Sequence, residues 1–310
     1  MVDRVTTPGP TQFPLPPPDG WLEYADWRGD AGSVVGRVLV RPGVGSVEPR
    51  GTRHILVYLP PSLAAGETDR RYRVLYMHDG QNLFDAGTSG SGEWQVDEAM
   101  ERLAGEGLEA IVVGIPNAEA ADPPQPNGRA VEYSPHPHEN RGGGGADAYL
   151  AFIAGTVKPL IDATFPAMRD LGSTGIAGSS LGGLISLYAL VARPDVFGFA
   201  GIVSPALWFA GGRLMSEHAP SLWPGENLRV YLDVGGREGD HETDPARRAE
   251  MNRRYVKDAR SLRRLLVGNG FREGDDLLYV EDAEARHHES AWAARVPGML
   301  RFLLRPLSGG

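Results

Sequence analysis

TGIAGSSLGG, at residues 174–183, is a short apolar run that breaks into a Gly-x-Ser-x-Gly turn and leads into a helical pattern. This order is typical of a nucleophile elbow, a sharp strand-to-helix turn that lifts one serine hydroxyl above the edge of a sheet. We expect glycines on both sides of the serine because a Cβ there would collide with the neighbouring strand or helix. The stretch therefore predicts a strand over 174–177 and makes Ser180 the candidate nucleophile.

The flanks of this stretch carry the prediction, because the pentapeptide alone is weak in a chain with 41 glycines among 310 residues. Ile176 and Ala177 suit a buried strand. Residues 184–191 form a helical pattern that is apolar nearly all round, and Pro194 ends it. The alternative is a glycine-rich loop whose serine caps a helix, and the flanks favour the elbow.

Composition bounds what the protein can be. The chain is 41% apolar, which is enough for a buried core, and its length fits one large α/β domain or two small ones. It has no cysteine, so disulfides, cysteine-ligated metals and cysteine nucleophiles are excluded. A net charge of −9 argues against a nucleic-acid partner, which needs a cationic face. The arginines of 253–264 alternate with leucines, as on a solvated helix face.

The N-terminus and the order of the elements complete the outline. Residues 1–20 are proline-rich and predict a poorly ordered lead-in with neither a signal peptide nor a membrane span, so we expect a cytoplasmic location. Residues 21–310 are predicted to form a single domain. Strands are expected at 34–41, 54–59, 73–77, 110–115, 174–177, 199–203, 228–234 and 277–280. Helices are expected at 93–103, 146–163, 251–267 and 291–304.

This alternation of strands and helices predicts an α/β fold with a mostly parallel sheet covered on both faces. One long segment, 116–145, lacks a regular pattern and is rich in proline and glycine. Long loops of this kind often bind ligands, so it is the candidate substrate lid.

A serine nucleophile needs a base and a carboxylate, and in such sheets they follow the serine in the order acid, then histidine. The strand at 228–234 runs into an acidic loop in which Glu238 is the first choice, Asp240 the second and Asp233 the third. A hydrated acidic loop or a cation site is the alternative. His287 and His288 precede the last helix, and one of them should reach Ser180.

An oxyanion needs backbone N–H donors. The amide of Leu181, directly after the nucleophile, should supply one, and the stretch from Asp79 to Gln81 should supply the second. His78 with Asp79, or the pair in His136-x-His138, could instead suggest a metal site. The spacing is not that of common zinc sites and no third ligand is indicated, so no metal and no cofactor are expected.

Several blocks in order resemble one family: YMHDGQNLFD at 76–85, EWQVDE at 93–98, RAVEYSP at 129–135, GSSLGG at 178–183, SPALW at 204–208 and HHESAW at 287–292. Together they resemble the esterase family of α/β-hydrolases that includes the enterochelin esterases and relatives of esterase D and feruloyl esterase. The resemblance spans about residues 54–304. It implies an α/β-hydrolase fold and a serine esterase that acts on a small-molecule ester through an acyl-enzyme.

The resemblance also suggests roles for single residues. The family's last motif is similar to His-Asn-Glu with a tryptophan five residues after the histidine, which implies His287 as the base and places His288 at the asparagine position. Glu238 matches the family's acid, and Arg129, Glu132 and Tyr133 resemble positions that line the pocket. Independently of the resemblance, Trp94 and Trp208 are candidate aromatic walls that would be equally at home in the core.

Two other functions fit the same residues. An acyltransferase would use the same triad and deliver the acyl group to another alcohol. A silent binding protein would keep the fold alone, although retention of serine, carboxylate and histidine argues against it. The sequence leaves open whether the ester is a siderophore, a carbohydrate acyl ester or a simple short-chain ester, and it does not fix the oligomeric state.

Overall fold

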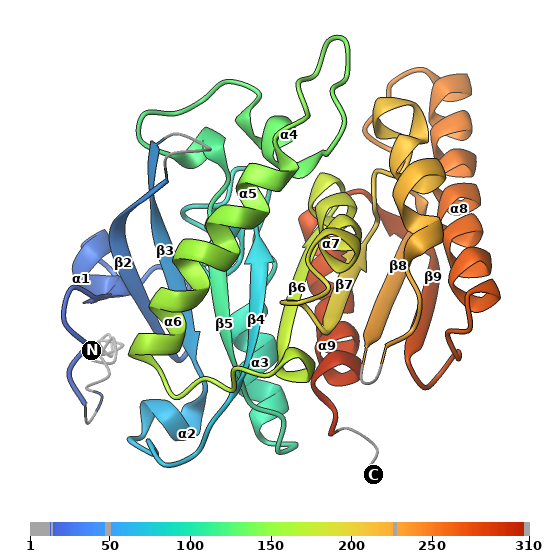
Figure 1. Cartoon of the computed structure of the whole chain (residues 1–310). Helices are drawn as coiled ribbons and strands as arrows, with labels where there is room; N and C mark the ends of the chain where they lie inside the picture. The colour runs from blue at the N-terminus through green and yellow to red at the C-terminus, as the bar shows by residue number, and fades with distance from the viewer. Residues whose placement is uncertain (1–12, 14, 47–50, 226–227, 307–310) are drawn as a thin grey trace, which may run out of the picture.

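The computed structural model describes residues 13, 15–46, 51–225 and 228–306, and these build a nine-stranded sheet (Figure 1). The strand order is β1-β2-β3-β5-β4-β6-β7-β8-β9. Antiparallel pairing joins β1 to β2, β2 to β3 and β3 to β5, and the remaining neighbours are parallel. The predicted α/β fold with a mostly parallel sheet is confirmed.

The strands at the centre of the sheet are buried throughout, which matches their near-continuous apolar sequences. Two strands, β5 and β7, have the bounds expected from the sequence, and the other expected strands are longer in the structure. The strands are β1 (Leu22–Glu23), β2 (Arg37–Ser46), β3 (Gly51–Leu59), β4 (Arg73–His78), β5 (Ala110–Ile115), β6 (Thr174–Ser179), β7 (Phe199–Val203), β8 (Arg229–Arg237) and β9 (Leu277–Arg286).

Helices cover both faces of this sheet (Figure 1). One face carries α5 (Ala146–Phe152), α6 (Lys158–Thr164), α7 (Leu181–Ala192) and α8 (Pro245–Gly268), and the other carries α1 (Tyr24–Arg28), α3 (Val96–Ala104) and α9 (Glu289–Leu304). Short helices occupy the connections: α2 (Pro61–Ala64), η1 (Gly80–Asn82), η2 (Ala118–Ala120), α4 (Gly128–Tyr133), η3 (Ile153–Val157), η4 (Leu171–Ser173), η5 (Phe209–Gly212), η6 (Leu214–His218) and η7 (Ala219–Ser221).

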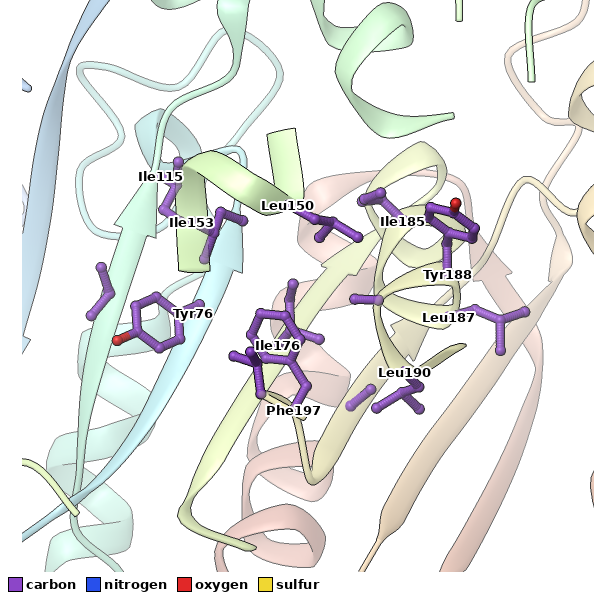
Figure 2. Close-up of a cluster of buried hydrophobic side chains, with 14 of the residues drawn as sticks. Tyr76, Ile115, Leu150, Ile153, Ile176, Ile185, Leu187, Tyr188, Leu190 and Phe197 are labelled. Atoms are coloured by element: carbon purple, nitrogen blue, oxygen red, sulfur yellow. The ribbon is translucent and has the colours of Figure 1, made fainter. Parts of the chain in front are cut away.

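Successive side chains of β6 point to opposite faces of the sheet, so this strand contributes to the hydrophobic clusters on both faces. Ile176 is fully buried among residues of the α5 to α8 face, whereas the next residue, Ala177, is buried on the α3 and α9 face. Figure 2 shows Ile176 and Phe197 lying between Tyr76 of β4 and Leu190 of α7. The strand that leads into the predicted elbow therefore packs against hydrophobic side chains on both faces of the sheet.

Three segments differ in detail from the sequence expectation. The helix expected at 146–163 contains a π turn, η3, that ends two residues before Pro159, whose missing N–H and bulky ring disturb regular helical bonding. The segment 116–145 contains η2 and α4, so it is not free of regular structure. Much of the proline-rich lead-in lies outside the described residues, but the Leu15 carbonyl accepts a hydrogen bond from Arg37 at 2.7 Å.

Searched over the described residues, the structure has no helix with both the length and the apolarity that crossing a membrane requires.

Replacing Ile176 by alanine should lower the free energy of unfolding by about 2–5 kcal/mol, because it removes buried methyl groups and leaves a cavity beside β6. Urea denaturation followed by circular dichroism measures this change. The control is Val267→Ala in α8, where the side chain is 44% exposed and the effect should stay within about 0.5 kcal/mol. Equal losses in the two variants would contradict the central position of Ile176.

Candidate active site

Ser180 occupies the turn between β6 and α7 in a backbone conformation that ordinary residues rarely adopt, with φ 59° and ψ −117°. The end of β7 and the residues after it hold this conformation in place. The Ser180 amide donates to the Val203 carbonyl at 2.9 Å, and its own carbonyl accepts from the Ala206 amide at 2.9 Å. The turn lies at the carboxyl edge of the parallel strands, the upper edge of the sheet in Figure 1.

The glycines around Ser180 differ in how much they are needed. A Cβ at Gly178 would lie 2.9 Å from Cδ2 of His78, and one at Gly183 would lie 2.9 Å from the Val203 carbonyl oxygen. At Gly182 the nearest atom would be 3.5 Å away, which is an ordinary contact. The expected collision of a Cβ is therefore confirmed at Gly178. The expectation is wrong at Gly182, because the glycine that needs to be without a Cβ is Gly183.

Glu238 and His287 form a hydrogen-bonded pair. Nδ1 of His287 donates to Oε2 of Glu238 at 2.5 Å, which leaves Nε2 of the ring as the acceptor. The Glu238 carboxylate is fully buried, and its Oε1 accepts from the Ser204 hydroxyl and the Gly235 amide, both at 2.6 Å. His287 and Ser180 line the same two cavities. This arrangement can orient an imidazole for proton transfer at the serine.

The competing acid and base candidates have other partners. Asp240 forms ion pairs with Arg237 at 2.7 Å and Arg286 at 3.1 Å. Nδ1 of His288 accepts from the Ser290 amide at 3.2 Å and so caps the start of α9. Among the candidates from the sequence, only Glu238 and His287 contact each other as an acid and a base should.

Behind Glu238 lies a buried polar group that sequence reasoning missed. Arg295 of α9 donates to both carboxylate oxygens of Asp233, at 2.8 and 3.2 Å, and to the Ser204 hydroxyl at 3.0 Å. Burial raises the pKa of Asp233, and the charge and hydrogen bonds of Arg295 offset only part of the rise. Ser204 directly follows β7 at the edge that carries the elbow, and that position is the signal that could have identified it.

Of the backbone amides expected to bind the oxyanion, those of Leu181 and Gln81 lie at helix starts, whereas that of Asp79 has another partner. Leu181 begins α7 and Gln81 lies in the first turn of η1, where N–H groups have no partner inside the helix. The Asp79 amide instead donates to the Tyr133 hydroxyl at 3.0 Å, so the expectation for Asp79 is corrected. A Cβ at Gly80 would lie 2.5 Å from backbone atoms of Gly114 and Ile115 at the end of β5, which explains the glycine in this loop.

A first cavity of about 440 Å³ opens on one side of Ser180 and is lined in part by Trp94, Gln81 and Arg129. Arg129 forms a two-pronged ion pair with Asp79, with both N–O distances 2.8 Å. Burial alone would raise the pKa of Asp79, but the charge and hydrogen bonds of Arg129 outweigh burial and hold it below its usual value. The cavity wall therefore carries a cation that is already neutralised.

The structure places Glu132 and Tyr133 behind this wall, which contradicts the expectation that they line the pocket. Glu132 is 1% exposed and pairs with the equally buried Arg53 at 2.7 Å. Tyr133 is fully buried, and its ring lies under the Arg129 guanidinium at 5.2 Å. Both residues hold α4 against the sheet. Their sequence neighbour Arg129 is the one that reaches the cavity.

A second cavity of about 510 Å³ lies on the other side of Ser180 and His287. Trp208 and Tyr255 form its aromatic part, and Arg141, Arg247 and Arg254 are among its charged residues. Burial raises the pKa of Tyr255 to about 12. Tyr255 is a further neighbour of the nucleophile that the sequence did not indicate.

The histidines considered as metal ligands do not act as the sequence pairs suggest. His78 is 2% exposed, and its Nδ1 shares a 2.9 Å hydrogen bond with the Tyr149 hydroxyl. Burial lowers the pKa of His78 to about 3, so the ring is neutral beneath the elbow. His136 and His138 point to different neighbours, because the His138 ring packs on Phe209.

His78 should make the protein less stable in acid. The unfolded chain binds a proton at this residue below about pH 6.5, whereas the folded chain resists protonation down to about pH 3. The free energy of unfolding should thus fall with decreasing pH between 6 and 4, with His78 contributing a slope of up to about 1.4 kcal/mol per pH unit.

Urea denaturation at several pH values, compared with His78→Gln, measures this contribution. The variant should have a shallower slope, while the control His54→Gln, at a partly exposed histidine, should keep the slope of the parent protein. Identical slopes for His78→Gln and the parent would rule out His78 as the source.

This chain is similar to known proteins. The sequence profile described as "Esterase: Putative esterase" matches residues 46–303, most of the chain. The chain belongs to this family. This esterase is 28% identical over 246 residues to the uncharacterized protein YbbA of Bacillus subtilis, covering 77% of this chain and 88% of YbbA. It is 27% identical to the siderophore enterobactin esterase of Emericella nidulans, over 53% of this chain and 58% of that protein.

Solved structures show the same fold. The BES protein from Bacillus cereus has a TM-score of 0.63 at 21% identity and covers 97% of this esterase and 100% of its own chain. The siderophore hydrolase EstA from Aspergillus nidulans has a TM-score of 0.63 at 21% identity, with 85% and 94% covered. This esterase therefore has the α/β-hydrolase fold, and its family makes it a carboxylic ester hydrolase.

Proposed function

We propose that this esterase cleaves carboxylic esters through a Ser180–His287–Glu238 triad and an acyl-enzyme. The observation that carries the proposal is the 2.5 Å bond between His287 Nδ1 and the buried Glu238, beside an elbow serine in the same cavities. In the first step His287 Nε2 takes the proton of Ser180, whose Oγ attacks the ester carbonyl. Glu238 holds the ring in the required tautomer and stabilises the imidazolium that forms.

The oxyanion of the tetrahedral intermediate would accept hydrogen bonds from the amides of Leu181 and Gln81. Its collapse breaks the carbon–oxygen bond to the alcohol, which leaves with the proton held by His287. Water then attacks the acyl-Ser180 with His287 again as the base, and the acid is released. Because Ser180 lies between two cavities, the acyl and alcohol parts of the ester can lie on opposite sides of the nucleophile.

The proposed substrate is a small-molecule ester, and Arg129, Trp94 and Trp208 are the proposed contacts. Relatives named as siderophore esterases make that class one to test, beside carbohydrate acyl esters and short-chain esters. Transfer of the acyl group to a second alcohol needs the same triad, and product analysis with an added alcohol distinguishes it from hydrolysis. The cytoplasmic location and the lack of a nucleic-acid partner stay predictions from the sequence.

Removal of the triad residues should abolish turnover of a short-chain nitrophenyl ester. Ser180→Ala and His287→Ala should each lower kcat by about 10⁴-fold or more, because both act on the same proton transfer. His288→Ala is the matched control and should stay close to the parent value, since His288 caps a helix. Circular dichroism establishes that each variant is folded.

A separate pair of variants tests the acid. Glu238→Gln keeps the size of the side chain but removes its charge, and it should lower kcat by about 10²–10⁴-fold with little change in KM. Asp240→Asn should leave kcat nearly unchanged. If folded parent protein hydrolyses no ester and its Ser180 is not labelled by a fluorophosphonate, the triad proposal fails and a silent binding protein takes its place.

A further inference from the structure

Two imidazoles and a carboxylate meet away from the catalytic pair. His136 belongs to the loop between α4 and α5, which projects beyond the carboxyl edge of the sheet in Figure 1, and Glu217 and His218 end η6. Nε2 of His136 lies 3.1 Å from Nε2 of His218 and 3.6 Å from Oε2 of Glu217. All three candidate ligand atoms lie within 4.8 Å of one another. None of these residues lines either cavity at Ser180.

The distances fit a shared metal ion. Tetrahedral zinc with bonds of about 2.0–2.1 Å separates two ligand nitrogens by about 3.3 Å and places the ring centres about 5.2 Å apart. The rings of His136 and His218 have centres 5.0 Å apart, so they converge on a common point as two ligands would. A collinear N–H···N bond of the observed length would hold the ring centres about 5.4 Å apart.

The surroundings prepare the ligands for a cation. The His136 side chain is buried, and its Nε2 faces both Nε2 of His218 and the Glu217 carboxylate. Glu217 provides the negative charge, and its present partner is Arg213 in the same turn, at 2.7 and 3.0 Å. Arg213 is about half exposed and can release one carboxylate oxygen by turning into solvent.

We propose that His136, His218 and Glu217 bind one divalent transition-metal ion, with water completing the coordination. Two imidazoles and one carboxylate suit Zn²⁺ and its neighbours better than Ca²⁺ or Mg²⁺, which prefer oxygen ligands alone. The ion would fasten the α4–α5 loop to η6. That loop carries Arg141, which lies over the Trp208 ring at 5.2 Å in the second cavity, so the metal would stiffen one wall of the site from outside.

The test uses the full chain without a histidine tag, stripped with EDTA and titrated with Zn²⁺ by calorimetry. We expect one ion per chain with a micromolar or tighter Kd and a rise of several degrees in Tm that EDTA reverses. Co²⁺ in its place should give the visible absorption of a tetrahedral site, a readout that is independent of ester hydrolysis.

Four variants assign the ligands. His218→Ala and Glu217→Gln should each weaken Zn²⁺ binding at least tenfold, whereas His138→Ala, two residues from His136 in the same loop, should bind as the parent does. Arg213→Ala should bind more tightly than the parent, because it frees the Glu217 carboxylate. This gain cannot arise from a folding defect.

Two results would overturn the proposal. One is the lack of saturable Zn²⁺ binding by both the parent and Arg213→Ala. The other is binding that His218→Ala and Glu217→Gln leave unchanged, which would assign the ion to other surface histidines and leave His136 and His218 joined by a hydrogen bond alone.

Discussion

The buried ion pair between Arg295 and Asp233 fixes the geometry on which the rest of the site depends. Asp233 lies in β8, which Glu238 directly follows, and Arg295 lies in α9, whose first turn follows His287. The pair therefore ties the strand that carries the acid to the helix that follows the base. Both partners are almost fully buried, so separating them would leave an uncompensated charge, which typically costs about 3–5 kcal/mol.

Ser204 joins this pair to the proposed catalytic carboxylate. Its hydroxyl accepts from Arg295 and from Trp292 Nε1 and donates to Glu238, so all the hydrogen-bonding capacity of the hydroxyl is used. The Ser204 amide also donates to Asp233 at 2.9 Å. One residue at the end of β7 thus sets the positions of two acids that the sequence offered as rivals. Their roles differ because one carboxylate faces an arginine and the other faces a histidine.

Local patterns explain how much of the site could be predicted from the sequence. The elbow, the order of acid and base after it, and the amide of Leu181 all follow from short-range rules about strands, turns and helix starts. The burial of Glu132 and the bond from the Asp79 amide to Tyr133 depend on how α4 lies against the sheet, and no short-range pattern specifies that. The same limit hid Arg295, whose partners Asp233 and Ser204 are distant in the sequence.

In the fold, too, some features could be predicted from local sequence patterns and others could not. The apolar central strands were predictable because helices on both faces require nearly continuous apolar sequence. The short elements β1 and α1 were missed because they have too few residues for a periodic pattern. Glycine spacing gave the elbow, but only the packed structure shows that Gly183, and not Gly182, faces the backbone of the next strand.

The anchoring of α4 has a consequence for how substrates enter. Arg53–Glu132 and Arg129–Asp79 hold this short helix by two ion pairs, which join it to β3 and to the end of β4. Swinging the whole segment outward would break both pairs at once, so a slow gate that opens before each encounter is disfavoured. The association rate of a substrate should then be set by diffusion into a preformed opening, and selectivity by the shape and charge of that opening.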